Sequence, residues 1–173
     1  CDQGVDAKSF GGHVMFEPWS VETKAGDCYK VYTPIWNNVK TRDVEPPLAA
    51  PSELCAPEEW PASDALEGWG LAVAMNRGAD VVRPFVCLGE NKQTRDIPGT
   101  DGTSNLSENL SLGEISPHQC WHAGQRALQD GKQGAETFLK ELVWREFACH
   151  LMYHTPRMLT DNWREEWDSF PWN

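Results

Sequence analysis

The sequence has few cysteines, few basic residues and no long apolar run. Its six cysteines are spread along 173 residues without a C-x-x-C pair, which argues against a small disulfide scaffold or a structural zinc site. We therefore expect a reducing, intracellular compartment, the cytoplasm. No basic stretch followed by an apolar run opens the chain, so neither a signal peptide nor a transmembrane helix is visible. Because the first residue is Cys1 rather than Met, we expect the natural start to lie upstream.

Positive charge is also scarce, with 15 basic residues against 26 acidic ones and a formal net charge of −11. This balance speaks against a protein that coats nucleic acid through bulk positive charge. Any DNA contact must be local, with basic side chains around a cavity, because charges beyond about 10 Å are screened. With 40% hydrophobic residues, the chain is long enough for one compact core.

The first half of the chain has weak patterns and no internal repeat. The first forty residues mix glycine and aromatic residues with short β-type runs such as "CYKVYTPIW". Five prolines then fall between Glu45 and Pro61, where their density prevents both a helix and a central strand. We interpret this stretch as an extended interdomain linker.

Two helices are predicted in the second half. The first has Ser116 as N-cap, Pro117 at the first helical position, Gln119 three residues after the cap, and Gly131 just past its end. The second runs from about 135 to 154 and is stopped by Pro156. Its apolar stripe recurs every four residues, at Leu139, Val143, Phe147 and Leu151.

The second predicted helix also carries a polar face. Glu141, Trp144, Arg145 and Ala148 lie at i, i+3, i+4 and i+7, so they share one side of the helix. One interpretation is a solvated Glu141–Arg145 ion pair with Trp144 packed on a neighbour. The other is a pocket wall, where a guanidinium holds a phosphate, a carboxylate accepts a hydrogen bond and an indole stacks on a base.

Hydroxyl groups are concentrated upstream, at Thr103, Ser104 and Ser107, directly after a glycine-containing turn. Hydroxyls and free backbone N–H groups at a helix start can form a phosphate cradle. The alternative is ordinary N-capping of a short helix. Neither motif alone distinguishes these possibilities.

Several motifs in a fixed order resemble the cryptochrome/photolyase family. They are "RDIPGTDGTSNLSENLSLGEISP", "FLKELVWREFACHLMYHTP" and "WREEWDSFPWN". The family has R-D-x-P, G-T-S-x-L-S, G-x-x-S-P and E-L-x-W-R-E-F in that order. The resemblance covers roughly residues 28–173 and is strong from Arg95 onward.

The resemblance implies a mainly α fold: part of the all-helical FAD-binding domain of photolyases, preceded by the tail of an α/β antenna domain and a Pro-rich linker. Residues 1–40 would be the end of the antenna domain, 41–70 the interdomain linker and 71–173 the partial helical FAD-binding domain. It implies FAD as cofactor, and a second antenna chromophore of folate or deazaflavin type in the full-length protein.

The implied activity is that of a deoxyribodipyrimidine photolyase, a carbon–carbon lyase. In this light-dependent DNA repair, excited reduced FAD passes an electron to a cyclobutane pyrimidine dimer flipped out of the duplex. The implied partner is DNA that contains pyrimidine dimers, bound by a monomer without any membrane or metal ion.

By motif, three groups of site residues are implied. The cofactor contacts are Thr103, Ser104, Asn105, Leu106, Ser107, Phe138, Glu141 and Arg145. The DNA contacts are Arg95, Glu141, Trp144, Arg145 and Ala148. The catalytic residues are the dimer-facing pair Glu141 and Trp144, and Trp172 as the surface end of a tryptophan electron-transfer chain.

The sequence departs from the family in three places. Asn91 stands where the family has a Tyr at the end of a helix of about five turns, so an internal segment and one phosphate contact are expected to be missing. Ala148 stands where some members carry a Tyr. The chain stops at Asn173, before the region expected to supply flavin-ring contacts, so we expect these 173 residues to be inactive alone.

Two other functions remain open. A cryptochrome-type blue-light photoreceptor would keep the flavin cradle without repair, and a non-catalytic helical fragment would keep neither. His150 and His154 have a metal-compatible i, i+4 spacing, but no third ligand is apparent, so we interpret them as structural.

Overall fold

The computed structural model describes residues 4, 7–8, 10–53, 55–56, 58–59, 62–65, 99, 103–104 and 106–171. Within these residues the regular structure is helical, apart from an isolated β-bridge between Glu22 and Cys28. The mainly α fold is therefore confirmed. The α-helices are α1 (Tyr32–Val39), α5 (Ser107–Leu112), α6 (Pro117–Gln129) and α7 (Ala135–His154), and the 3-10 helices are η1 (Pro18–Ser20), η4 (Pro156–Leu159) and η5 (Glu165–Trp167).

Helix α6 begins and ends where its sequence signals predict. The Ser116 hydroxyl accepts a hydrogen bond from the Gln119 backbone N–H at 3.1 Å, and the Gln119 side chain accepts one from the Ser116 N–H at 2.9 Å. This reciprocal capping box satisfies two backbone donors at the helix start. Past the last turn, Gly131 adopts a left-handed φ of 69°, which costs glycine little.

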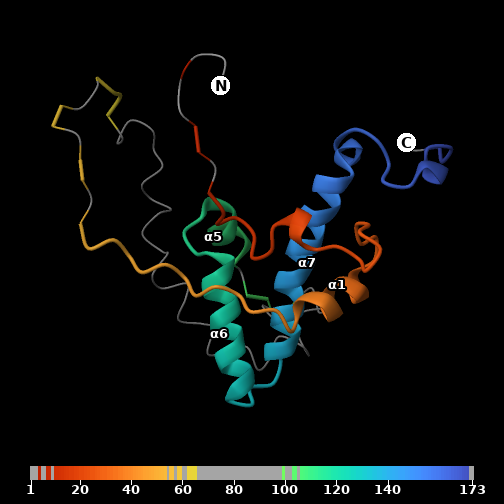
Figure 1. Ribbon diagram of the computed structural model, residues 1–173, viewed down its shortest axis with the longest axis horizontal. Coiled ribbons are helices and arrows are strands. Elements are labelled where there is room, and N and C mark those ends of the chain that lie inside the picture. The colour runs from red at the N-terminus through yellow and green to blue at the C-terminus, as the bar shows by residue number, and fades with distance from the viewer. Residues whose placement is uncertain are drawn as a thin grey trace.

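Helix α7 is the longest helix described and lies beside α6 (Figure 1). Leu139, Val143 and Phe147 of the predicted stripe are buried and Leu151 is partly buried, as expected. The two helices approach closely at Gly124 of α6, where an added Cβ would lie 2.7 Å from Leu139 Cδ2. The absence of a side chain at Gly124 therefore allows this contact.

The β-type interpretation of "CYKVYTPIW" is wrong for its second part, because Tyr32–Val39 form helix α1. Pro34 stands in the first turn, where backbone N–H groups have no partner within the helix, so it does not interrupt the hydrogen bonds. Ile35 and Val39 are four residues apart and both are buried. Packing against α7 thus decides the local conformation.

The proline-rich stretch has no helix or strand over residues 43–53, as its prolines predict. Its start is fixed to α6, because His122 Nε2 lies 3.1 Å from the carbonyl oxygens of both Val44 and Glu45. From there the chain runs away from the helices (Figure 1).

One core joins the N-terminal part to the helices. It consists of Val21, Ile35, Val39, Val44, Leu106, Ile115, Cys120, Trp121, Phe138, Leu139, Leu142, Val143 and Phe147. In the described part of the chain, no helix is both long and apolar enough to span a membrane.

Candidate functional site

A hollow of about 790 Å³ is formed by α5, α7 and His13 of the N-terminal segment, the residues that precede α1. Leucine and phenylalanine side chains line it together with hydroxyls, a carboxylate and a guanidinium. The lining residues are His13, Thr103, Ser104, Leu106, Ser107, Leu110, Ser111, Phe138, Glu141, Leu142, Arg145, Ala148 and Cys149. Seven of the predicted cofactor contacts are among them: Thr103, Ser104, Leu106, Ser107, Phe138, Glu141 and Arg145.

The α7 side of the hollow contains most of the polar face predicted from the sequence. Glu141, Arg145 and Ala148 are spaced by four and three residues, and all three line the hollow. Arg145 forms an ion pair with its neighbour Glu146, with Nη1 3.1 Å from Oε1. The lining by Glu141, Arg145 and Ala148 agrees with the pocket wall, whereas the packing of Trp144 on Tyr32 agrees with the alternative.

The clustered hydroxyls also line the hollow. Thr103, Ser104 and Ser107 all line it. Helix α5 begins at Ser107. Its N-cap residue is Leu106, which makes no side-chain capping hydrogen bond. These hydroxyls line the same hollow as Arg145.

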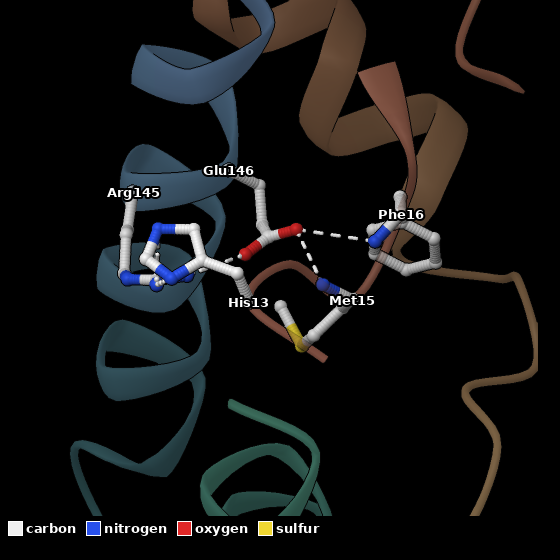
Figure 2. A network of polar contacts seen from close by, with 5 residues as sticks. All are labelled: His13, Met15, Phe16, Arg145 and Glu146. Atoms are coloured by element: carbon white, nitrogen blue, oxygen red, sulfur yellow. Dashed lines mark hydrogen bonds and ion pairs between the residues drawn. The ribbon is translucent and has the colours of Figure 1, made fainter. Parts of the chain in front are cut away.

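Arg145 belongs to a polar network that includes the N-terminal segment (Figure 2). Its Nη2 lies 3.3 and 3.2 Å from the two ring nitrogens of His13. Glu146 Oε2 accepts hydrogen bonds from the backbone N–H groups of Met15 at 2.7 Å and Phe16 at 3.1 Å. Burial raises the pKa of Glu146 to about 7, although these N–H groups and Arg145 act in the opposite direction.

Trp144 does not line the hollow but stacks on Tyr32 of α1. The ring centroids are 3.9 Å apart and the planes differ by 4°, while the indole remains 47% exposed. The Tyr32 hydroxyl donates a hydrogen bond to the Lys140 carbonyl at 2.9 Å. Burial, with a smaller effect of the Glu141 charge, raises the pKa of Tyr32 to about 12, so this hydroxyl stays protonated. Tyr32 thus covers one face of the indole that is predicted to meet a base.

Three predicted site residues lie outside the described residues: Arg95, Asn105 and Trp172. Asn91, which marks the expected missing segment, lies outside them as well. The structure therefore places neither the predicted DNA phosphate contact nor the predicted end of the tryptophan chain.

The two histidines of α7 bind backbone groups of the N-terminal part. His150 Nε2 accepts a hydrogen bond from the Tyr29 N–H at 3.1 Å, and His154 Nε2 lies 3.3 Å from the Pro18 carbonyl oxygen. Burial lowers the pKa of His150 and so favours the neutral ring that this bond requires. Within the described residues, no group of three or more metal-ligating side chains occurs.

Sequence reasoning missed Glu146, His13 and Tyr32 as neighbours of the site. A signal exists only for Glu146, which is three residues after Val143 and precedes Phe147, at a position of α7 that faces the core. A carboxylate at such a position requires a buried partner. Nothing in the sequence pattern distinguishes His13 or Tyr32.

The lining residues fit a flavin dinucleotide. Hydroxyls and a guanidinium are donors suited to a diphosphate, and Ser104, Ser107 and Arg145 all line the hollow. Phe138 and Leu142 provide an apolar surface beside them. FAD is therefore compatible with this donor set.

Comparison with known proteins gives consistent matches. The family model for DNA photolyase matches residues 1–52. The chain is 36% identical to a deoxyribodipyrimidine photo-lyase of Agrobacterium fabrum, over 99% of this chain and 40% of that protein. It is 31% identical to the Escherichia coli protein of the same name, over 98% of this chain and 40% of that protein. A bacterial class III photolyase from Agrobacterium tumefaciens has a similar structure, with a TM-score of 0.85 and 33% identity over 99% of this chain and 40% of that chain.

The chain spans about two fifths of the length of these relatives. The alignment with the A. fabrum protein runs over 191 positions against the 173 residues of this chain, a difference of 18, so this chain lacks residues that the relative has. The ordered motifs, the helical fold and these similarities agree with one another. Over nearly its whole length, the chain is similar to DNA photolyases.

Proposed function

We propose that the full-length protein repairs DNA as a deoxyribodipyrimidine photo-lyase that uses FAD and light to split cyclobutane pyrimidine dimers. The observation that carries the proposal is the hollow, which Thr103, Ser104 and Ser107 line together with Glu141 and Arg145 of α7. The names of the relatives support the same activity. When bound, reduced FAD would supply the electron that splits the dimer.

The residues of the hollow would have distinct roles. Arg145 and the hydroxyls of Ser104 and Ser107 would hold the cofactor phosphates, because charge-assisted hydrogen bonds are the strongest that side chains offer. Glu141, exposed at the hollow, would accept hydrogen bonds from a polar heterocycle. Trp144 would stack on a base of the lesion.

Two further roles are proposed for residues outside the described ranges. Arg95 would contact a DNA phosphate, and Trp172 would be the surface end of an electron-transfer chain. The division of the chain is a proposal as well: residues 1–40 would end an antenna domain, 41–70 would link it, and 71–173 would belong to the FAD-binding domain. The contacts of Glu146 and His150 with the N-terminal segment would then lie across that domain boundary.

The test is a repair assay with the full-length protein and DNA that contains one defined cyclobutane dimer. We expect bound flavin, and loss of dimers under near-ultraviolet or blue light but not in the dark. A flavin-loaded protein that repairs nothing would support a photoreceptor role instead. A protein with neither flavin nor repair would favour a non-catalytic role.

A further inference from the structure

We propose that Glu146 is a positioning residue that holds the Arg145 guanidinium at the hollow while fixing the N-terminal segment against α7. The ligand of Arg145 would be the phosphate of a dinucleotide, so this inference rests on the proposed function. Glu146 does not line the hollow. It would therefore act only through Arg145.

The two carboxylate oxygens of Glu146 have different partners. Oε2 accepts both backbone N–H groups, from Met15 and Phe16, and Oε1 accepts the Arg145 Nη1 hydrogen bond at 3.1 Å. Figure 2 shows the carboxylate between the N-terminal segment and the guanidinium. The Glu146 side chain is 5% exposed and that of Arg145 22%, so water competes little for these bonds.

The network restricts Arg145 from two directions. Nη1 is held by Glu146, and Nη2 lies against the His13 ring, which belongs to the same segment that Glu146 fixes. An unrestrained arginine has several rotatable bonds, and ordering such a side chain costs up to about 2 kcal/mol. A guanidinium that is already ordered binds an anion without that cost.

Glu146→Gln separates the two functions of the carboxylate. An amide has one acceptor oxygen and one donor nitrogen, yet donors face it on both sides, the two backbone N–H groups and the guanidinium. We expect the amide oxygen to stay with the two N–H groups and the NH₂ group to face Arg145. The segment would remain docked while Arg145 loses its acceptor.

The experiment is a double-mutant cycle in the full-length protein after removal of bound flavin. FAD affinity is measured at pH 8 for wild type, Glu146→Gln, Arg145→Ala and the double variant. We expect Glu146→Gln to weaken FAD binding about ten-fold in the Arg145 background, since a hydrogen bond to a charged group contributes about that factor. In the Arg145→Ala background the same change should have almost no effect.

The matched control is Glu136→Gln, which removes another ion-paired carboxylate of α7, 2.8 Å from Lys140 and away from the hollow. It should leave FAD affinity unchanged. Equal weakening by Glu146→Gln in both Arg145 backgrounds would overturn the proposal, because Glu146 would then act through the general fold. No weakening in either background would overturn it as well.

A crystal structure of Glu146→Gln separates this proposal from the proposed function. If the wild-type protein binds no FAD, the proposed function fails. The position of the Arg145 guanidinium in the crystal structure still tests the positioning role of Glu146. We expect the guanidinium to leave its place beside residue 146; a guanidinium that stays in place would overturn the inference. If Glu146→Gln does not fold, Glu146→Asp replaces it in both experiments with the same expected outcomes, because the shorter carboxylate cannot reach both partners.

Discussion

At the scale of single residues, Trp144 has one face covered by Tyr32 and remains about half exposed. The Tyr32 ring stacks on the indole with centroids 3.9 Å apart, while Trp144 as a residue remains 47% exposed. A base can therefore stack on one side only. If Trp144 stacks on a base of the lesion as proposed, the orientation of the indole matters as well as its presence.

We expect Trp144→Ala in the full-length protein to weaken binding to dimer-containing DNA about ten-fold or more and to leave flavin content nearly intact. Stacking of a base on an aromatic side chain contributes about 1–3 kcal/mol. The measurement is a fluorescence-anisotropy titration. Trp19→Ala is the control, since Trp19 is also exposed and packs on Tyr153. Unchanged lesion affinity would exclude the role assigned to Trp144.

The cofactor cradle is tested by Ser104→Ala combined with Arg145→Ala in the full-length protein. These changes remove a hydroxyl and a cation from the hollow, and a hydrogen bond to a charged group contributes about 1.5–3 kcal/mol. We expect less flavin absorbance per mole of purified protein. Ser20→Ala with Arg164→Ala, at exposed positions away from the hollow, should retain full flavin. Full occupancy in the first pair would mean that the phosphates lie elsewhere.

The pKa of Glu146 gives a pH dependence with a defined sign. In the folded protein this carboxyl has a pKa of about 7 against an ordinary value of 4.5. The folded state therefore binds more protons between these values, so the contribution of Glu146 to stability is greatest below pH 4.5 and is lost as pH rises through about 7.

Glu146→Gln does not titrate at this position, so its melting temperature should rise relative to wild type as pH increases from 5 to 8. Differential scanning fluorimetry of both full-length proteins checks this. Arg145 contacts the carboxyl and His13 contacts Arg145. Both residues are the same in the two proteins, which makes the difference specific to Glu146. A difference that does not change with pH would contradict the prediction.

At the scale of helices, the contact between α6 and α7 depends on Gly124. We expect Gly124→Ala to lower the melting temperature although alanine favours helices. The new methyl group would lie 2.7 Å from Leu139 Cδ2 and 3.1 Å from Phe138 Cδ1, and overpacking a core costs about 1–3 kcal/mol. The gain in helix propensity is only about 1 kcal/mol. Gln125→Ala, at a partly exposed position of the same turn, should be nearly neutral.

The sequence predicted α6 and α7 because their signals are local. The Ser116 capping box, Gly131 and the four-residue stripe of α7 act within a few turns. The polar face with Glu141 and Arg145 followed from the same periodicity. Helix α1 was missed because its conformation depends on burial of Ile35 and Val39 against a helix about a hundred residues away. The contacts of Glu146 with Met15 and Phe16 span a similar separation and were missed for the same reason.

At the scale of the whole molecule, the chain spans about two fifths of its relatives' length. We expect the 173-residue chain expressed alone to retain little or no FAD and to repair no dimers. Cofactor affinity is the binding free energy that remains after the cost of ordering the cofactor and the protein. A site that has only part of its lining residues therefore binds weakly. The absorbance near 450 nm of the purified chain, compared with the full-length protein, is the measurement. Stoichiometric flavin with light-dependent repair would contradict this expectation.

The side chains of Glu146 and His150 recognise main-chain N–H groups, those of Met15, Phe16 and Tyr29. Such recognition does not depend on the side chains at these three positions. These three hydrogen bonds can therefore persist when the side chains change, although the Met15, Phe16 and Tyr29 side chains also pack against the core. Proline is the exception, because it has no N–H to donate. Among homologues, we therefore expect proline to be absent at positions 15, 16 and 29, rather than one sequence motif to be preserved there.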